Sequence, residues 1–477
     1  MRVYGVACGM LLWGWGFLLG QTVSIHGSNP DYSGKSLQIT LDNNPFITIP
    51  GSVRRVVCTS LGHFEFSTEV ESSTLIHVVT GVYRAYLFVE PGISYEIELP
   101  LYREKAYAEM ISPFFQPLEV ALKVLSRSSL DSNLCVNDAP ELNHMIARFD
   151  TLFYEVNESV IMNRRIGKKS NLDSIERSIE LTFAMDTAQF FVDYRRYKYG
   201  VLKLNEGRTG LETISRDYLG PVVRTSHPGF MELFGAMFKG FIYYYSRTPL
   251  GKDLWRHINR TQYIDSVRYT IGKHPAIWND TLADMVLLQG LSNLFYEGNV
   301  HKDAILMLLD SMIQNPVSLH FAIYTSQLKR KLASLVIGHP PPEFQLSDLD
   351  GTLCTPRDFL GKYVYLMFCT PDNYGCMMEY PYLQSFILKH QAYLQVVTVM
   401  VAENELQVKE FMKRNGYDWK VLYFDGQPGI LSDFLVKAFP TAYLIGPDGD
   451  LILSPSTLPS DGFEQQLFRI MRSKGEI

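Results

Sequence analysis

A continuous apolar run from Tyr363 to Phe368 is the feature that most constrains the fold of this chain. A strand with apolar side chains on both sides is typical of a parallel sheet that is covered on both faces. The run leads into Cys369, and a helical pattern follows from about Gly375 to Gln391. A strand, a short loop and a helix in this order predict an α/β unit.

The α/β pattern begins after a stiff segment and continues to the end of the chain. Gly338-His339-Pro340-Pro341-Pro342 cannot continue a helix and is predicted to be a linker. Residues 337–477 are therefore predicted to form one α/β domain. Its further strands are expected at 394–401, 420–424, 440–445 and 451–453, and its further helices at 405–414 and 463–471.

The preceding residues divide into two parts, because 477 residues are too many for a single core. Residues 21–101 alternate apolar and polar positions and predict an antiparallel β-sandwich. From residue 102 to 336 the period is helical, with Leu118, Leu122 and Leu125 on one predicted helix face. The predicted fold class is multidomain α+β, with an N-terminal β-sandwich, a central all-α region and a C-terminal α/β domain.

Residues 1–20 have the pattern of a secretory signal peptide. Arg2 supplies a short positive region, an apolar stretch follows, and Gly20-Gln21 is a plausible cleavage point. The stretch is short for a membrane span, and no other apolar run is long enough to cross a bilayer. We expect an exported chain, periplasmic or elsewhere in the cell envelope, without a membrane span in its mature part.

Charge and motif spacing limit the function classes. The net charge of −6 makes nucleic acid an unfavourable partner, and the basic stretch Arg195-Arg196-Tyr197-Lys198 is interpreted as a solvated helix face. The histidines show no metal-ligand spacing, and no phosphate-binding glycine loop is present, so no metal and no cofactor are expected. The many aromatic residues of the helical part are interpreted as packing residues, although a small-ligand site there stays an alternative.

Residues 337–477 resemble the thioredoxin-like modules of the TlpA and ResA type, which are exported thiol–disulfide proteins of bacteria. The two preceding parts resemble, more loosely, the regions that precede such modules in exported proteins. The matching motifs, in chain order, are Glu343–Leu346, Asp348–Gly351, Asp358–Lys362, Cys376 with Glu379 and Pro381, Phe439–Ile445, and Pro447–Gly449.

The resemblance implies a Cys-x-x-Cys motif at the start of the helix, but only its second cysteine, Cys376, is present. Asn373 stands where the nucleophilic cysteine is expected. The resemblance also implies that Pro440 is a cis-proline, that Phe439 before it offers backbone groups to an incoming peptide, and that Tyr374 borders the same substrate-binding groove.

Two-thiol exchange needs a thiolate at a helix N-terminus and a second thiol one turn along. Asparagine is a strong N-cap residue, so Asn373 is predicted to cap the helix and to end the ordinary chemistry. Two interpretations of Cys376 then remain: it is a buried packing residue, or it is a single reactive thiol. Cys369 is interpreted as a packing residue, although a disulfide between Cys369 and Cys376 is conceivable. Glu379 either assists proton transfer to thiols, as the resemblance implies, or acts as a surface or capping carboxylate.

These observations predict a thioredoxin-fold protein whose dithiol activity is lost or weak. Its expected role is to bind an envelope protein or peptide, and a partner that contains thiols is among those expected. The alternative is an enzyme that performs single-thiol chemistry, or rearranged thiol–disulfide chemistry with Cys369 and Cys376.

Overall fold

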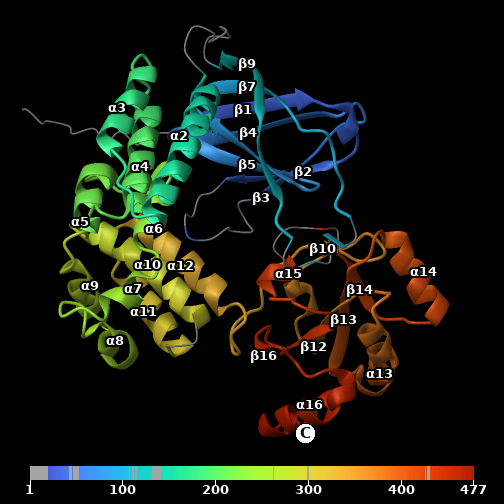
Figure 1. The fold of residues 1–477 in the computed structure, drawn as a ribbon. Helices are drawn as coiled ribbons and strands as arrows, with labels where there is room; N and C mark the ends of the chain where they lie inside the picture. The colour runs from blue at the N-terminus through green and yellow to red at the C-terminus, as the bar shows by residue number, and fades with distance from the viewer. Residues whose placement is uncertain are drawn as a thin grey trace, which may run out of the picture.

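A computed structural model describes most of the chain (Figure 1). Strands from the first part of the chain, in blue, lie beside the green and yellow helices, and the orange and red C-terminal part lies below the strands. Residues 1–19, on which the signal-peptide prediction rests, lie outside the described residues. No helix within the described part of the chain is long and apolar enough to cross a membrane. The described residues are 20–41, 46, 53–106, 108–109, 112, 115–130, 141–261, 263–297, 300–424, 426 and 430–477.

The first part contains two sheets with the strand orders β4-β1-β7-β9 and β3-β2-β5-β6-β8. Buried apolar residues of both sheets, such as Ile25, Ile39 and Phe66, belong to one hydrophobic core. The alternation of buried and exposed residues along β4 follows from the two-residue period of a strand with one covered face. The strands are β1 (Gln21–Ser28), β2 (Ser36–Leu41), β3 (Val53–Val57), β4 (His63–Val70), β5 (Thr74–Thr80), β6 (Tyr83–Val89), β7 (Ile93–Glu98), β8 (Leu118–Ala121) and β9 (Lys123–Ser129).

Two sequence predictions are wrong in this part. The sheets are mixed and not purely antiparallel, because β1 pairs with β7, and β6 with β8, in parallel. The helix predicted on Leu118, Leu122 and Leu125 is replaced by β8 and β9, so strands extend past residue 101 into the region predicted to be all-α. Leu122 is buried while Leu118 and Leu125 are half-exposed. The leucine spacing imitated a helix face, and pairing with β6 and β7 decided the local structure.

Helices make up the described elements between residues 141 and 336. Their aromatic residues pack against one another as predicted: Phe149 contacts Phe183, Phe191 and Tyr199 at ring centroid distances of 5.7–6.0 Å. The helices are α2 (Leu142–Arg165), α3 (Leu172–Thr182), α4 (Gln189–Glu206), α5 (Leu211–Ile214), α6 (Pro228–Met237), α7 (Phe241–Tyr245), α8 (Leu254–Arg256), α9 (Ile264–Gly272), α10 (Asp280–Glu297), α11 (Lys302–Gln314) and α12 (Leu319–Ala333), with the short π-helices η3 (Ser215–Leu219) and η4 (His257–Thr261).

The basic stretch on α4 is not the solvated helix face that we predicted. Arg195 and Lys198 are almost fully buried. Arg195 donates to both oxygens of Glu180 at 2.9 and 3.1 Å, and the Lys198 ammonium lies 2.7 Å from a carboxylate oxygen of Glu232. Because α4 lies between α3 and α6, which carry these glutamates, its cations meet carboxylates in place of water.

The C-terminal part is built on a five-stranded sheet with the order β14-β13-β12-β15-β16. Strands β12, β13 and β14 are parallel, whereas β15 and β16 pair antiparallel. The elements follow the predicted order, with β10 (Leu346–Ser347), β11 (Leu353–Cys354), β12 (Tyr363–Cys369), α13 (Tyr374–His390), β13 (Leu394–Met400), α14 (Glu405–Asn415), β14 (Lys420–Tyr423), α15 (Ile430–Asp433), β15 (Thr441–Ile445), β16 (Leu451–Leu453), the 3-10 helix η6 (Pro459–Asp461) and α16 (Phe463–Ser473).

The central strand β12 is buried along its whole length, and its residues alternate between two cores. Leu366 and Phe368 belong to the core on one face of the sheet. Tyr365, Met367 and Cys369 belong to the core on the other face, together with buried residues of α13, α14 and α16. This parity places the Cys369 side chain under α13.

The proline-rich linker is attached to the edge of the C-terminal sheet. The amide of Gly338 donates to the carbonyl of Leu451 at 2.8 Å, and the amide of Leu451 donates to the carbonyl of His339 at 2.9 Å. The Ser454 hydroxyl also donates to the carbonyl of Leu335 at 2.8 Å. The linker therefore pairs with β16, which is otherwise an edge strand.

Candidate functional site

The turn between β12 and α13 sets the geometry of the site. Asn373 has an extended backbone, and its side-chain oxygen accepts the amide hydrogen of Cys376 at 3.1 Å. This bond satisfies one of the free N–H groups of the first turn of α13. The predicted N-cap role of Asn373 is confirmed, and the position at the start of the helix carries a side-chain amide.

Cys369 and Cys376 are brought into the same buried core as free thiols, close enough to influence each other's pKa. The Thr370 amide also donates to the Cys376 sulfur at 3.5 Å. The neighbouring Cys369 thiol and the Thr370 amide favour the thiolate and hold the pKa of Cys376 below its usual range despite burial. Burial raises the pKa of Cys369 well above its usual range. If one thiol of the pair is deprotonated, the negative charge therefore lies on Cys376, and Cys369 beside it stays neutral.

Tyr380 completes this cluster and was not anticipated from the sequence. It lies one turn after Cys376 on α13, and its buried hydroxyl donates to the carbonyl of Thr370 at 3.0 Å. The hydroxyl also lies 3.5 Å from the sulfur of Met400. Burial raises the pKa of Tyr380 well above its usual range, and the neighbouring Cys369 and Cys376 add to this rise. The four-residue spacing from Cys376 was the available signal, because residues i and i+4 share a helix face.

Glu379 points to a different neighbour. Its carboxylate is buried and accepts the Ser460 amide hydrogen at 2.9 Å and the Ser460 hydroxyl hydrogen at 2.6 Å. The residue therefore joins α13 to η6. Both carboxylate oxygens have a donor from Ser460, which is the arrangement expected of a structural carboxylate. A role in proton transfer to the thiols stays a prediction.

The segment around Phe439 and Pro440 forms the other part of the site, next to the start of α13. The Phe439–Pro440 peptide bond is cis, as predicted. A Cβ atom built on Gly375 would lie 3.1 Å from Pro440 Cδ, so the first turn of α13 contacts the cis-proline segment. Tyr374 is 73% exposed beside this contact, and Phe439 is half-buried. Within the described residues, no backbone hydrogen bond reaches Phe439.

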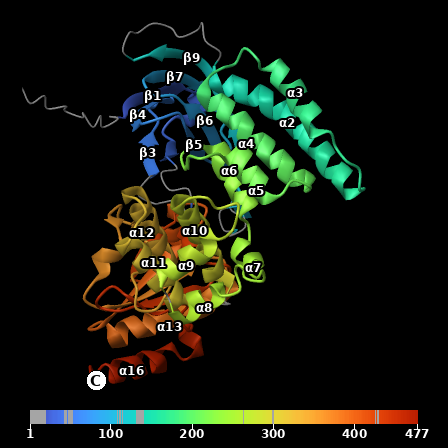
Figure 2. The same cartoon turned by 90° about the vertical axis from the view of Figure 1, so that its left-hand side faces the viewer.

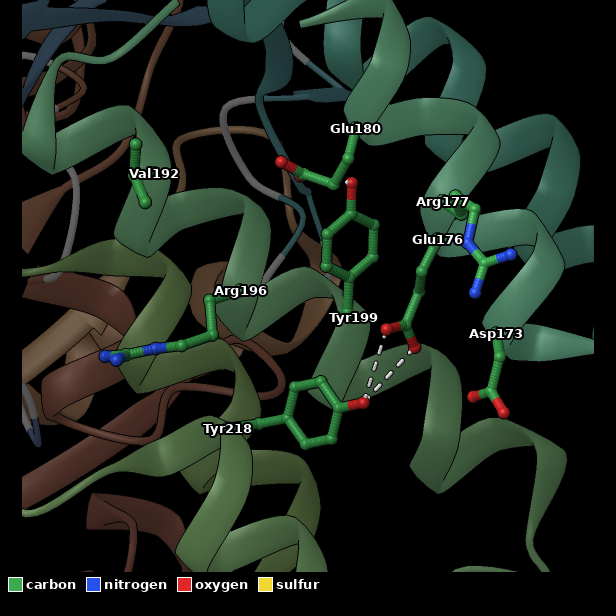
Figure 3. Close-up of a pocket in the computed structure, with 8 residues that line it drawn as sticks. All are labelled: Asp173, Glu176, Arg177, Glu180, Val192, Arg196, Tyr199 and Tyr218. Carbon is green, nitrogen blue, oxygen red and sulfur yellow. Dashed lines mark hydrogen bonds between the residues drawn. The ribbon is translucent and has the colours of Figure 1, made fainter. Parts of the chain in front are cut away.

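The helical region contains a cavity of about 440 Å³ (Figure 3). The residues that line it are far in sequence from Cys369 and Cys376. Its polar groups already bind one another: the Tyr218 hydroxyl donates to both oxygens of Glu176 at 3.3 and 3.4 Å, and Tyr199 donates to Glu180 at 2.8 Å. A ligand here stays a prediction. Nowhere in the described part of the chain do three or more metal-binding side chains gather.

Comparison with known proteins shows which protein family the C-terminal part resembles. Residues 337–453 match the AhpC/TSA family, which together with the relatives below defines a thioredoxin-like domain. The thiol–disulfide oxidoreductase ResA of Geobacillus kaustophilus is 30% identical over 150 residues, which cover 31% of this chain and 84% of the relative. ResA of Bacillus subtilis is 32% identical over 137 residues, which cover 28% of this chain and 75% of the relative.

A solved structure of a putative thiol:disulfide interchange protein DsbE from Chlorobium tepidum is also similar. The two chains are 25% identical in sequence. The match covers 28% of this chain and 98% of the solved chain, with a TM-score of 0.26. The chain belongs to the ResA-type thiol–disulfide oxidoreductase family. The matches to ResA cover less than a third of the chain.

Proposed function

We propose that the thioredoxin-like domain binds an extended segment of a protein partner in the cell envelope without the two-thiol exchange typical of its family. One observation carries the proposal: Asn373 caps α13 where a nucleophilic thiol would stand, while Cys376 behind it is fully buried. A partner disulfide that approaches the start of α13 would meet an amide and not a thiolate. Exchange needs a thiolate that the partner sulfur can reach.

The groove beside the cis-proline keeps the parts that a binding site needs. Phe439 offers a backbone amide and carbonyl that no described residue occupies, so an extended peptide could pair with them. Tyr374, Met377 and Met378 expose 73%, 45% and 51% of their surfaces on the first turns of α13. Methionine and tyrosine supply adaptable apolar contacts at binding surfaces. Export to the envelope is part of the proposal and rests on the pattern of residues 1–20.

The binding proposal is tested by site-specific photo-cross-linking in producing cells. A photoreactive residue at Tyr374 is expected to capture a discrete envelope protein, and the capture is expected to fall when Gly375→Val narrows the contact with Pro440. The matched control places the same probe at Leu388, which is 74% exposed near the other end of α13. Equal capture at both positions, or capture unchanged by Gly375→Val, would count against the groove.

A second function is favoured by the two buried thiols that share one core, Cys369 and Cys376. The Cys376 thiolate would attack a partner disulfide, form a mixed disulfide and release one partner thiolate. Cys369 would then lose its proton and attack the Cys376 sulfur, which releases the second partner thiolate and leaves a disulfide between Cys369 and Cys376. The partner is reduced by two electrons, and the pair is oxidised by two.

Insulin reduction separates the two functions. The binding proposal expects no turnover by the wild-type protein, whereas the dithiol mechanism expects turnover that both Cys369→Ser and Cys376→Ser abolish. Cys354→Ser is the matched control, because Cys354 is a buried free thiol on β11 outside the cluster. Turnover that Cys354→Ser leaves intact and Cys376→Ser removes would replace binding by catalysis as the function of the domain.

A further inference from the structure

The segment from residue 237 to 279 differs in charge from the rest of the molecule. It contains seven lysines and arginines against two aspartates, a net charge of +5 in a chain whose overall net charge is −6. It spans α7, α8, η4 and α9 at one end of the helical region. A local charge opposite in sign to that of the whole protein indicates an electrostatic role, because charge of one sign gathers on part of the surface.

The cations of this segment are available to a partner. Within residues 243–273, the exposed cationic side chains are those of Arg247, Lys252, Arg256, Arg260 and Lys273. Among the described residues, a carboxylate pairs with only one of these five cations, Arg256, whose guanidinium lies 3.1 Å from Asp253. Lys252, Arg256 and Arg260 follow one another at intervals of four residues, in the turn before α8, at the end of α8 and in η4.

Large apolar side chains are exposed in the same segment. Tyr244, Tyr263 and Tyr269 expose 66%, 72% and 70% of their surfaces, and Leu250 exposes 51%. Two cations lie over tyrosine rings: Lys273 Nζ is 4.3 Å from the centroid of Tyr269, and Arg247 is 4.0 Å from that of Tyr243. Exposed tyrosines and exposed cations therefore occur in the same segment, and two of the cations lie on tyrosine rings.

The elements that carry these residues lie together. The Tyr245 hydroxyl on α7 donates to the carbonyl of Thr270 on α9 at 2.9 Å, and His274 after α9 packs on Phe241 of α7. Figures 1 and 2 show α7, α8 and α9 side by side in both views. We call the exposed cations and tyrosines of residues 243–273 the basic aromatic surface.

We propose that the basic aromatic surface docks the protein on an anionic phospholipid membrane. Lysine and arginine are attracted to anionic lipid headgroups, and tyrosine and leucine insert at the boundary between headgroups and acyl chains. A soluble polyanion would use the cations but would leave the exposed Tyr244, Tyr263 and Leu250 in water. The combination of charge and interleaved apolar side chains thus favours a bilayer surface.

Vesicle flotation with the mature chain, residues 21–477, tests this proposal. We expect binding to phosphatidylcholine vesicles that contain phosphatidylglycerol, little binding to pure phosphatidylcholine, and weakening at high salt. Each cation contributes about a fivefold factor in affinity near such a surface. The triple variant Lys252→Glu/Arg260→Glu/Lys273→Glu is therefore expected to lose more than about a hundredfold in vesicle affinity.

The matched control is Lys168→Glu/Lys169→Glu/Lys413→Glu, which changes the net charge equally at exposed lysines outside the surface. It is expected to bind vesicles like the wild-type protein. Tyr244→Ala/Tyr269→Ala is expected to weaken the binding that remains at high salt. Equal losses in both triple variants would overturn the proposal. Binding to dextran sulfate with no binding to anionic vesicles would also overturn it, and would assign the surface to a soluble polyanion.

Discussion

Replacing the cap of α13 by a cysteine tests the account of the site most directly. In Asn373→Cys the side-chain oxygen that accepts the Cys376 amide hydrogen at 3.1 Å is lost. Loss of an asparagine N-cap lowers the free energy of unfolding by about 1 kcal/mol. For a domain of this size that corresponds to a fall of about 4 °C in melting temperature. Asn373→Ser keeps a cap oxygen and is expected to stay within a few tenths of a kcal/mol of the wild type.

The Asn373→Cys variant is also expected to change how many thiols of the native protein react with an alkylating reagent. Cys58, Cys354, Cys369 and Cys376 are all buried, so the native protein is expected to resist alkylation at these four positions. The new thiol would sit at a half-exposed helix N-terminus, where the helix dipole and free amides lower its pKa relative to free cysteine. One additional thiol per chain should therefore react rapidly, and measurable insulin reduction should appear if the groove is intact.

The number of alkylated cysteines per chain is measured by mass spectrometry after timed alkylation of the native protein, in a Cys135→Ser background. That background removes Cys135, which lies outside the described residues. Unchanged melting in Asn373→Cys would refute the capping role, and an unreactive new thiol would refute the geometry of the turn. A reactive thiol without insulin reduction would mean that the groove itself no longer supports exchange.

Three further outcomes follow from buried polar groups. Burial lowers the pKa of His227 to about 4, and its ring donates to the Phe190 carbonyl while the other nitrogen has no partner among the described residues. The folded protein therefore binds fewer protons than the unfolded chain below pH 6.5, and the free energy of unfolding should fall by about 2 kcal/mol between pH 7.5 and 5. Denaturant titrations should show a smaller fall in His227→Phe, and an equal fall would contradict this account. Tyr380→Phe should cost about 1 kcal/mol by removing a buried hydroxyl bond, measured by urea unfolding, and no loss would mean that the hydroxyl is not bound. Glu379→Ala should cost about 1–3 kcal/mol in urea unfolding because it leaves the two Ser460 donors without their acceptor. In a Ser460→Ala background Glu379→Ala should cost less, because only the backbone amide then loses its acceptor, and an equal cost in both backgrounds would contradict the bond to the hydroxyl.

The C-terminal fold was predictable because each of its elements carries its own local signal. The apolar run of β12, the helical period of α13 and the capping preference of Asn373 all point to the same structure. The pairing of β8 and β9 was not predictable, because short strands depend on partners far away in the sequence. Leu122 shows this clearly, since its burial is decided by the two sheets around it.

The proximity of Cys369 and Cys376 was only partly predictable from the sequence. Its two cysteines are seven positions apart, and no motif spacing brings them together. The alternation along β12 places Cys369 on the same face as Tyr365 and Met367, so the parity of the strand carried the signal. The right-handed crossover fixes which face α13 covers only once the side of β12 on which β13 pairs is known, and a local sequence pattern does not contain that strand order.

The pairing of the linker with β16 has a consequence for any experiment on the isolated domain. A chain that begins after His339 would lose the backbone partner of Leu451, and the outer strand of the sheet would present free N–H and C=O groups. Unpaired edges of this kind recruit other strands and promote self-association. Truncations that are meant to isolate the thioredoxin-like fold should therefore begin before Gly338, so that the edge stays covered.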